Sequence, residues 1–154
     1  LVRQGIAQAA RLSTSHRFTV EFPPELPAAE GDPGLLLQVL TNLYENAIKY
    51  SPGGGEIVTS AACEAGLVRL SVADHGIGIA PEHAGEVFER FRRPGADPTV
   101  RGMGLGLYLS RLLVEAMGGT IRAESPGRGL GATFTVTLPV AGGWDEPDTD
   151  RGRP

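Results

Sequence analysis

The sequence predicts an α+β protein: a two-layer sandwich in which helices cover one face of a mixed sheet. Residues 33–50 carry apolar side chains at three- and four-residue spacing, which is typical of an amphipathic helix. Residues 67–74 alternate between apolar and polar side chains, as a half-buried strand does. The predicted elements follow the order αβαββαβαββ, which lacks the strict alternation of a doubly wound parallel sheet.

The first half of the chain begins with a short amphipathic helix over residues 1–12 and a strand over residues 17–22, which ends at two prolines. Asp32 and Pro33 predict the start of the long helix, because Asp is a favoured N-cap and Pro is favoured at the first helical position. This helix ends at about Tyr50, before a Ser-Pro-Gly-Gly-Gly stretch.

The second half contains a hairpin, two helices and two closing strands, predicted over residues 56–64, 67–74, 81–91, 105–117, 120–125 and 132–140. The helix over 81–91 opens on proline. The next helix is predicted from an apolar stripe formed by Leu105, Tyr108 or Leu109, Leu112 and Ala116. Residues 92–103, between these helices, form a loop rich in Gly, Pro and Arg.

Length and composition are those of an ordinary globular domain, with 154 residues, of which 41% are apolar and 21% charged. We expect residues 1–140 to form one domain and residues 141–154 to be a disordered acidic tail. The net charge of −4 predicts no general attraction to nucleic acid or anionic membranes. The single cysteine excludes an internal disulfide and favours a reducing compartment. Because the chain begins at Leu1, we expect it to be a piece of a longer protein.

Asp74 is the first candidate site residue. It continues the apolar face of its strand, so its carboxylate emerges from a buried surface and needs hydrogen-bond donors. The glycines of DHGIGI (74–79) allow the backbone to approach a ligand closely. A turn aspartate before a glycine is the plainer interpretation, and a carboxylate that accepts a hydrogen bond from a planar amino group, such as that of adenine, is the functional one.

A second candidate is GMGLGL (102–107), in which glycines at alternate positions run directly into a helix. The N-terminus of a helix offers unpaired N–H groups and partial positive charge, which suit phosphate oxygens. The P-loop signature, the third glycine of the dinucleotide-binding motif and the protein-kinase motifs are all absent from the sequence.

The third candidate lies on the long helix, where Asn42, Asn46 and Lys49 share one face with Glu45 and Tyr50 beside them. Asparagine is a poor helix former, so two of them on one face need a reason. Amide oxygens are hard ligands of the kind that Mg²⁺ accepts together with waters and nucleotide phosphates, and Lys49 can neutralise phosphate charge. Solvated polar residues beside a core stripe are the alternative.

Taken together, these stretches resemble the GHKL ATP-binding fold, and specifically the catalytic ATP-binding domain of sensor histidine kinases. Four conserved stretches of that family, called the N, G1, F and G2 boxes, have counterparts here in the same order. NLYENAIKYSP (42–52) resembles the N box, DHGIGI (74–79) the G1 box, FERF (88–91) the F box and GMGLGL (102–107) the G2 box. The resemblance covers roughly residues 1–140 and implies a two-layer sandwich that binds ATP and Mg²⁺.

The resemblance also implies roles for individual residues. Asn46 would ligate Mg²⁺, Asn42 would support it, and Asp74 would bind the adenine amino group, assisted by Thr133. Residues 92–103 would form a lid that carries Arg93 toward the γ-phosphate. Other residues would line the nucleotide site, namely Lys49, Tyr50, Gly76, Gly78, Ile79, Gly102, Gly104, Leu105, Gly106 and Leu107.

The position of Asn42 separates the kinases from the hydrolytic members of the fold. In ATPases of the gyrase, MutL and chaperone types, a glutamate stands four residues before the metal-binding asparagine and activates water. An amide cannot act as a general base. We therefore expect phosphoryl transfer to another nucleophile, with Glu45 as the residue that polarises the incoming group. The alternatives are such an ATPase, an anti-sigma-factor serine kinase, or a nucleotide-binding module without catalysis.

No phosphoacceptor histidine motif accompanies these boxes in the chain. The resemblance therefore implies a separate histidine-containing dimerisation domain in the same full-length protein, a homodimer, and a response regulator as the final acceptor. It places the chain in the cytoplasm as a domain of a membrane-anchored sensor kinase that itself contacts no membrane.

Overall fold

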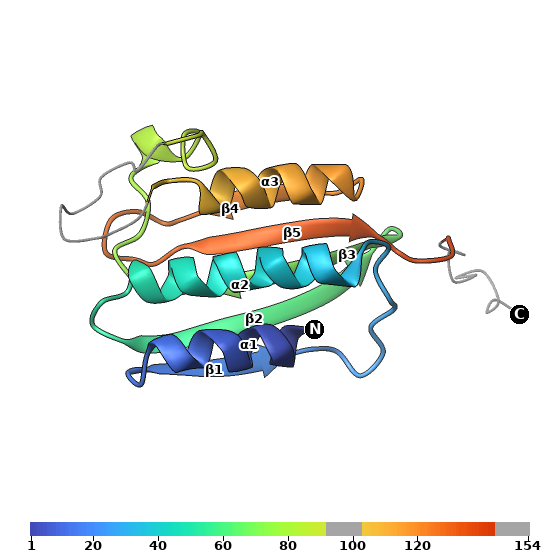
Figure 1. Ribbon diagram of the computed structural model, residues 1–154, viewed down its shortest axis with the longest axis horizontal. Coiled ribbons are helices and arrows are strands. Elements are labelled where there is room, and N and C mark those ends of the chain that lie inside the picture. The colour runs from blue at the N-terminus through green and yellow to red at the C-terminus, as the bar shows by residue number, and fades with distance from the viewer. Residues whose placement is uncertain (92–102, 144–154) are drawn as a thin grey trace, which may run out of the picture.

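The computed structural model describes residues 1–91 and 103–143. Figure 1 shows three α-helices in front of a five-stranded sheet. The elements are α1 (Val2–Ala9), β1 (His16–Glu21), α2 (Pro33–Lys49), β2 (Gly55–Glu64), β3 (Leu67–Ala73), α3 (Gly106–Ala116), β4 (Thr120–Glu124) and β5 (Thr133–Pro139), with short 3₁₀ turns at Ala10–Leu12 and Pro81–His83.

The sheet is mixed, with strand order β1-β2-β3-β5-β4. β1 pairs with β2 in parallel, and the other neighbours are antiparallel. The three helices lie on one face of this sheet (Figure 1), which confirms the predicted two-layer α+β sandwich. On β5 the buried side chains Phe134, Val136 and Leu138 alternate with threonines on the open face.

Helix α2 forms the centre of the helical layer, and its capping is as predicted. The Asp32 carboxylate accepts a hydrogen bond from the Leu35 N–H at 2.9 Å, and Pro33 occupies the first turn. Its apolar stripe is buried against the sheet at Val39, Leu40, Leu43 and Ala47. Full burial of a large apolar side chain stabilises a fold by about 1.5–3 kcal/mol, so α2 is held firmly in one orientation.

Residues 81–91 do not form the α-helix that the sequence predicts. The Phe91 N–H donates to the Gly104 carbonyl at 3.1 Å, and the other backbone hydrogen bonds of this stretch run to acceptors three residues earlier, as from the Glu89 N–H to the Glu86 carbonyl at 3.0 Å, which is the spacing of 3₁₀ turns. Gly85 lowers the helix propensity in the middle of this stretch. Phe88 is nevertheless buried, with its ring edge-to-face against that of Phe134.

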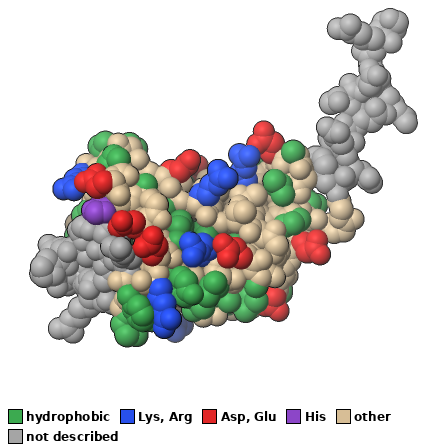
Figure 2. Space-filling model, turned by 90° about the horizontal axis from the view of Figure 1, so that it is seen from above, with side chains coloured by type: hydrophobic (Ala, Val, Ile, Leu, Met, Phe, Trp, Pro, Cys, Tyr) green, Lys and Arg blue, Asp and Glu red, His purple; other side chains and the backbone are tan. Residues whose placement is uncertain are grey.

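Helix α3 lies where predicted, but its buried side differs from the predicted stripe. Leu109 is 37% exposed and Leu112 is 42% exposed, whereas Ser110 and Val114 are fully buried. The helix carries apolar side chains around most of its circumference, so periodicity alone does not identify the core side. Figure 2 views the molecule from the side on which α3 and β4 lie, and hydrophobic side chains are interspersed there with acidic and basic ones.

Two predicted segments fall largely outside the described residues. These are the lid over 92–103, of which only Met103 is described, and the tail over 141–154, of which residues 144–154 are not described. None of the helices in the described part of the chain has the length and apolarity needed to cross a membrane.

Candidate functional site

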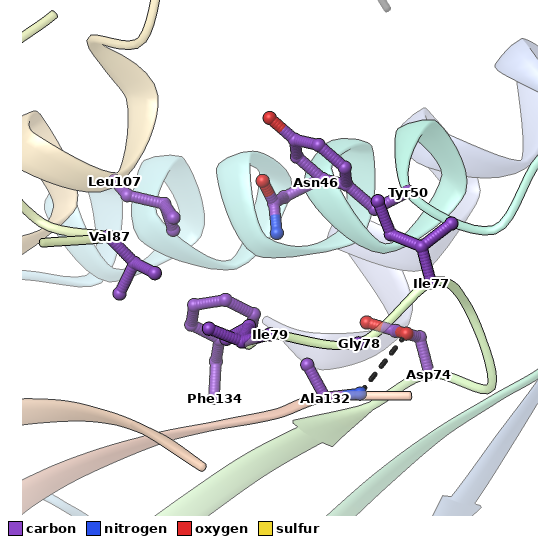
Figure 3. Close-up of a pocket in the computed structure, with 10 residues that line it drawn as sticks. All are labelled: Asn46, Tyr50, Asp74, Ile77, Gly78, Ile79, Val87, Leu107, Ala132 and Phe134. Carbon is purple, nitrogen blue, oxygen red and sulfur yellow. Dashed lines mark hydrogen bonds between the residues drawn. The ribbon is translucent and has the colours of Figure 1, made fainter. Parts of the chain in front are cut away.

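A cleft opens between the C-terminal half of α2, the loop after β3 and the start of α3 (Figure 3). It has two adjoining hollows, which share Asn46, Tyr50, Val87 and Leu107. The first hollow is also lined by Asp74, Ile77, Gly78, Ile79, Ala132 and Phe134. The second is also lined by Asn42, Glu45, Lys49, Met103, Gly104, Leu105 and Gly106.

Asp74 lies at the floor of the first hollow and is 7% exposed. Its Oδ1 accepts hydrogen bonds from the Gly76 N–H at 2.8 Å and from the Ala132 N–H at 3.3 Å. Burial raises the pKa of the Asp74 carboxyl, and these two donors offset only part of that rise. No residue in the described ranges donates to the other carboxylate oxygen, so that oxygen can accept a hydrogen bond from a ligand.

Two glycines allow the loop after Asp74 to pack against its neighbours. A Cβ at Gly76 would lie 2.0 Å from the Tyr50 carbonyl oxygen, and the adjacent Ile77 N–H donates to that same oxygen at 2.9 Å. Gly78 has a φ of +70°, and its Cβ would lie 2.1 Å from the carbonyl oxygen of Gly127. Larger residues at these two positions would push the loop away from α2 or from the turn that precedes β5.

Apolar side chains form the middle of the cleft. Figure 3 shows Val87, Leu107, Ile79 and Phe134 grouped at the end of the hollow away from Asp74. A planar aromatic ring could therefore bury its faces against hydrocarbon while its edge reaches the carboxylate.

The polar face of α2 lines the second hollow. The Asn42 amide nitrogen donates to the Gly106 carbonyl at 3.4 Å and to the Ser110 hydroxyl at 3.3 Å, so it ties α2 to α3. The half-buried Asn46 amide points into the cleft (Figure 3), and no described residue forms a hydrogen bond with it. The Lys49 ammonium lies 5.3 Å from the centre of the Tyr50 ring.

The start of α3 supplies the other wall of the second hollow. Among the described residues no side chain caps this helix, whereas α2 is capped by Asp32. Its first N–H groups thus have no acceptor within the helix and carry partial positive charge. Gly104, with a φ of +69°, turns the chain into the helix, and Gly106 leaves open space where a Cβ would stand. The arrangement suits an anion.

The family described as "Histidine kinase-, DNA gyrase B-, and HSP90-like ATPase" matches residues 31–142. The chain belongs to this family. The match includes all the residues that line the two hollows.

Curated relatives of this chain include a sensor protein and a sensor histidine kinase. The sensor protein KdpD of Rathayibacter rathayi is 42% identical over 132 residues, which are 82% of this chain and 15% of KdpD. The sensor histidine kinase WalK of Bacillus subtilis is 41% identical over 139 residues, 82% of this chain and 23% of WalK. The chain thus spans less than a quarter of the length of either relative.

Solved structures agree with the family assignment. The mycobacterial sensor histidine kinase MprB superposes with a TM-score of 0.79 at 29% identity, covering 90% of this chain and 91% of that one. Full-length ShkA, solved in complex with AMPPNP, superposes with a TM-score of 0.74 at 32% identity, covering 90% of this chain and 29% of ShkA.

The cleft of this ATPase domain brings together most of the residues singled out in the sequence. Those that line it are Asn42, Glu45, Asn46, Lys49, Tyr50, Asp74, Gly78, Ile79, Gly104, Leu105, Gly106 and Leu107. Gly76 does not line it but donates to Asp74. Arg93 and Gly102 lie outside the described residues.

Thr133 is the one described site candidate that neither lines the cleft nor forms a hydrogen bond with Asp74. It is on the open face of β5, because the next residue, Phe134, faces the core. Ala132 lines the cleft instead, and it is the Ala132 N–H that reaches Asp74. The expected assistance of Asp74 by the Thr133 side chain therefore does not fit this geometry.

Ser125 is a structural residue of the site that the sequence analysis missed. Its hydroxyl accepts from the Ile79 N–H at 3.0 Å and from the Gly127 N–H at 3.2 Å, and it donates to the Gly131 carbonyl at 2.6 Å. It thus fastens the loop after β3 to the turn before β5. Its only sequence signal is its place at the start of a glycine-rich turn.

Proposed function

We propose that this domain binds Mg-ATP and donates the γ-phosphoryl group to a histidine on a separate dimerisation domain of the same homodimeric sensor kinase, from which a response regulator receives it. The observation that supports this most is the convergence on one cleft of a buried carboxylate, an amide and a helix start, the last two without a side-chain partner among the described residues. The catalytic domain would comprise residues 1–140, followed by a tail over 141–154.

The adenine end of the proposed site is the first hollow. The oxygen of Asp74 that is not bonded to Gly76 or Ala132 would accept a hydrogen bond from the exocyclic amino group of adenine. A guanine would present a carbonyl oxygen there, opposite a carboxylate, so the site should prefer ATP to GTP. The apolar group around Ile79 and Phe134 would cover the faces of the ring.

The phosphate end is the second hollow. The first N–H groups of α3 and the backbone of Gly104 would hold phosphate oxygens, and Lys49 would offset their charge. In the part of the chain that the structure describes, no cluster of three or more His, Cys, Asp or Glu side chains could hold a metal. Mg²⁺ commonly needs only one or two protein oxygens when nucleotide phosphates and waters supply the others. The Asn46 amide oxygen fits that role, and the ion would supply neutralisation of phosphate charge.

The proposed reaction is an in-line transfer. The unprotonated nitrogen of the acceptor imidazole forms a bond to the γ-phosphorus while the bond from that phosphorus to the β,γ-bridging oxygen breaks, ADP leaves, and the proton on the other ring nitrogen passes to solvent. Asn42 cannot deprotonate water and is occupied in tying α2 to α3, so hydrolysis should be slow. The exposed Glu45, at the rim of the cleft, would orient the incoming imidazole. Arg93 and Gly102 enter the proposal through the family resemblance, Arg93 toward the γ-phosphate.

The surface beside the phosphate end suits a helical partner. Met103 is 74% exposed, and the exposed side of α3 continues with Leu109 and Leu112. An acceptor helix that covered these side chains would bury apolar surface and bring its histidine close to the second hollow. In a full-length sensor kinase anchored in a membrane, this domain would work in the cytoplasm.

The test is reconstitution. The domain is mixed with Mg-ATP labelled on the γ-phosphate and a separately made histidine-containing dimerisation domain, preferably from the same full-length protein. We expect acid-labile phosphate on the partner and little free phosphate without it. Acid-stable phosphate would indicate a serine kinase, and steady hydrolysis by the domain alone would indicate an ATPase of the gyrase or chaperone type.

A further inference from the structure

His16 connects β1 with the end of α2, although it belongs to none of the four sequence boxes that form the cleft. Its Nε2 is 2.9 Å from both the carbonyl oxygen and the hydroxyl of Ser51, and its Nδ1 is 2.7 Å from the Ser13 hydroxyl. Ser51 is 4% exposed. The imidazole is half-buried and has a hydrogen-bond partner on each nitrogen, so it forms a specific contact between β1 and the turn after α2, which are 35 residues apart in sequence.

The hydrogen bonds determine which nitrogen of His16 carries the proton. A carbonyl oxygen only accepts, and the Ser51 hydroxyl already donates to the Ala47 carbonyl. The Nε2 of His16 must therefore carry a hydrogen and donate toward Ser51. In the neutral ring, Nδ1 then accepts from the Ser13 hydroxyl. His16 thus acts as a donor that fixes the turn following α2.

That turn holds the loop of Asp74. The residue before Ser51 is Tyr50, whose carbonyl oxygen accepts from the Ile77 N–H at 2.9 Å. Gly76 packs so closely on this oxygen that no Cβ would fit. Figure 3 shows Tyr50 and Ile77 side by side next to Asp74. A shift of the turn would therefore move the loop that positions the carboxylate.

We propose that His16 is a positioning residue for the adenine end of the nucleotide site. It contacts no nucleotide, because it does not line the cleft. It keeps the Tyr50–Ser51 turn in the conformation in which Tyr50 can hold Ile77. Without the His16 donor, the competent arrangement is less populated and the apparent Kd rises in proportion. This inference rests on the proposed nucleotide binding.

The experiment measures the Kd of ADP by calorimetry for the parent domain and for His16→Leu, His16→Gln and Ser13→Ala. His16→Leu removes the donor and should raise the Kd about fivefold, from the loss of one hydrogen bond. His16→Gln keeps an N–H donor and should remain near the parent value. Ser13→Ala removes the Nδ1 partner at a half-buried position, together with the contacts of the Ser13 hydroxyl to Ser15, and should raise the Kd about twofold.

A second readout separates positioning from general stability. The Ile77 amide should exchange its hydrogen faster in His16→Leu, because its acceptor is less well held. Tyr44→Phe, which removes the buried hydrogen bond between the Tyr44 and Thr59 hydroxyls, is the control that lowers stability without touching the turn. It should leave both the Kd and the Ile77 exchange at parent values.

The outcomes are distinguishable. If the parent does not bind ADP, the proposed function is wrong. If the parent binds ADP, the His16 inference is overturned when His16→Leu has the same Kd for ADP and the same exchange rate of the Ile77 amide hydrogen as the parent. It is equally overturned if Tyr44→Phe weakens binding as much as His16→Leu, or if His16→Gln weakens it as much as His16→Leu.

Discussion

Replacing Asp74 with asparagine should separate nucleotide binding from stability, because the two should change differently. Asparagine keeps an oxygen that can accept from the Gly76 and Ala132 N–H groups, so the loop retains its internal bonds. The other carboxylate oxygen becomes an NH₂ group, which opposes the amino group of adenine. The variant should therefore fold normally and bind ADP poorly.

The magnitude follows from the single contact that is lost. A hydrogen bond to a charged acceptor contributes about 1.5–3 kcal/mol, which corresponds to a rise in Kd of about 10- to 150-fold. Stability should not fall. Burial raises the pKa of Asp74, so its ionisation lowers the unfolding free energy as the pH rises through that raised pKa. Asp74→Asn removes this penalty, and its melting temperature at neutral pH should equal or exceed that of the parent.

The assay combines calorimetric titration with ADP and thermal unfolding without nucleotide. Asp32→Asn is the matched control, since it makes the same chemical change at the far end of α2, where asparagine caps equally well. It should alter neither quantity. An Asp74→Asn variant that binds ADP like the parent would refute the assignment of the adenine end. In the parent, ADP affinity should also fall as the pH drops through the raised pKa of Asp74, since the protonated form is a poorer acceptor.

Three further substitutions test the frame of the site. Gly78→Ala should abolish ADP binding, because the added Cβ would lie 2.1 Å from the carbonyl oxygen of Gly127. The control is Gly85→Ala, whose Cβ would have no neighbour within 4 Å, and this variant should bind ADP normally in the same titration. Tyr44→Phe removes a buried 2.9 Å hydrogen bond to a threonine hydroxyl and should lower the unfolding free energy in urea by about 1–2 kcal/mol; an unchanged value would contradict the role of that bond. Asn42→Asp places a carboxylate against the Gly106 carbonyl, to which the Asn42 amide now donates. The melting temperature of Asn42→Asp should therefore be lower than that of Asn42→Ala, and the reverse order would contradict the observed contacts.

Much of the fold was predictable because local signals agreed with tertiary packing. The cap at Asp32, the stripe of α2 and the alternation of β3 each specify one arrangement. The failures arose where local signals were ambiguous. The stretch over 81–91 carries enough apolar residues for a helix but a central glycine, and α3 has two apolar sides, of which only packing selects one.

The site was predictable to the extent that it depends on glycines and polar residues next to element ends. The sequence does not show which way the side chains point at the start of β5. There, a difference of one position along the strand places a side chain either in the cleft or on the open face of the sheet. The side chain of Thr133 lies on the open face of the sheet, and the residue that contacts Asp74 is Ala132, through its N–H. The supporting contacts of His16 and Ser125 join segments far apart in the chain, and no local pattern marks them.

An NMR titration of the domain with Mg-AMPPNP tests the proposed site most directly. We predict that the amide signals of Ile77, Ile79 and Leu107 shift along one saturating curve with 1:1 stoichiometry. Signals from the open face of the sheet, such as those of Arg69 and Thr135, should stay in place. An unresponsive spectrum, or shifts confined to the open face, would contradict the claim that these segments form one nucleotide site.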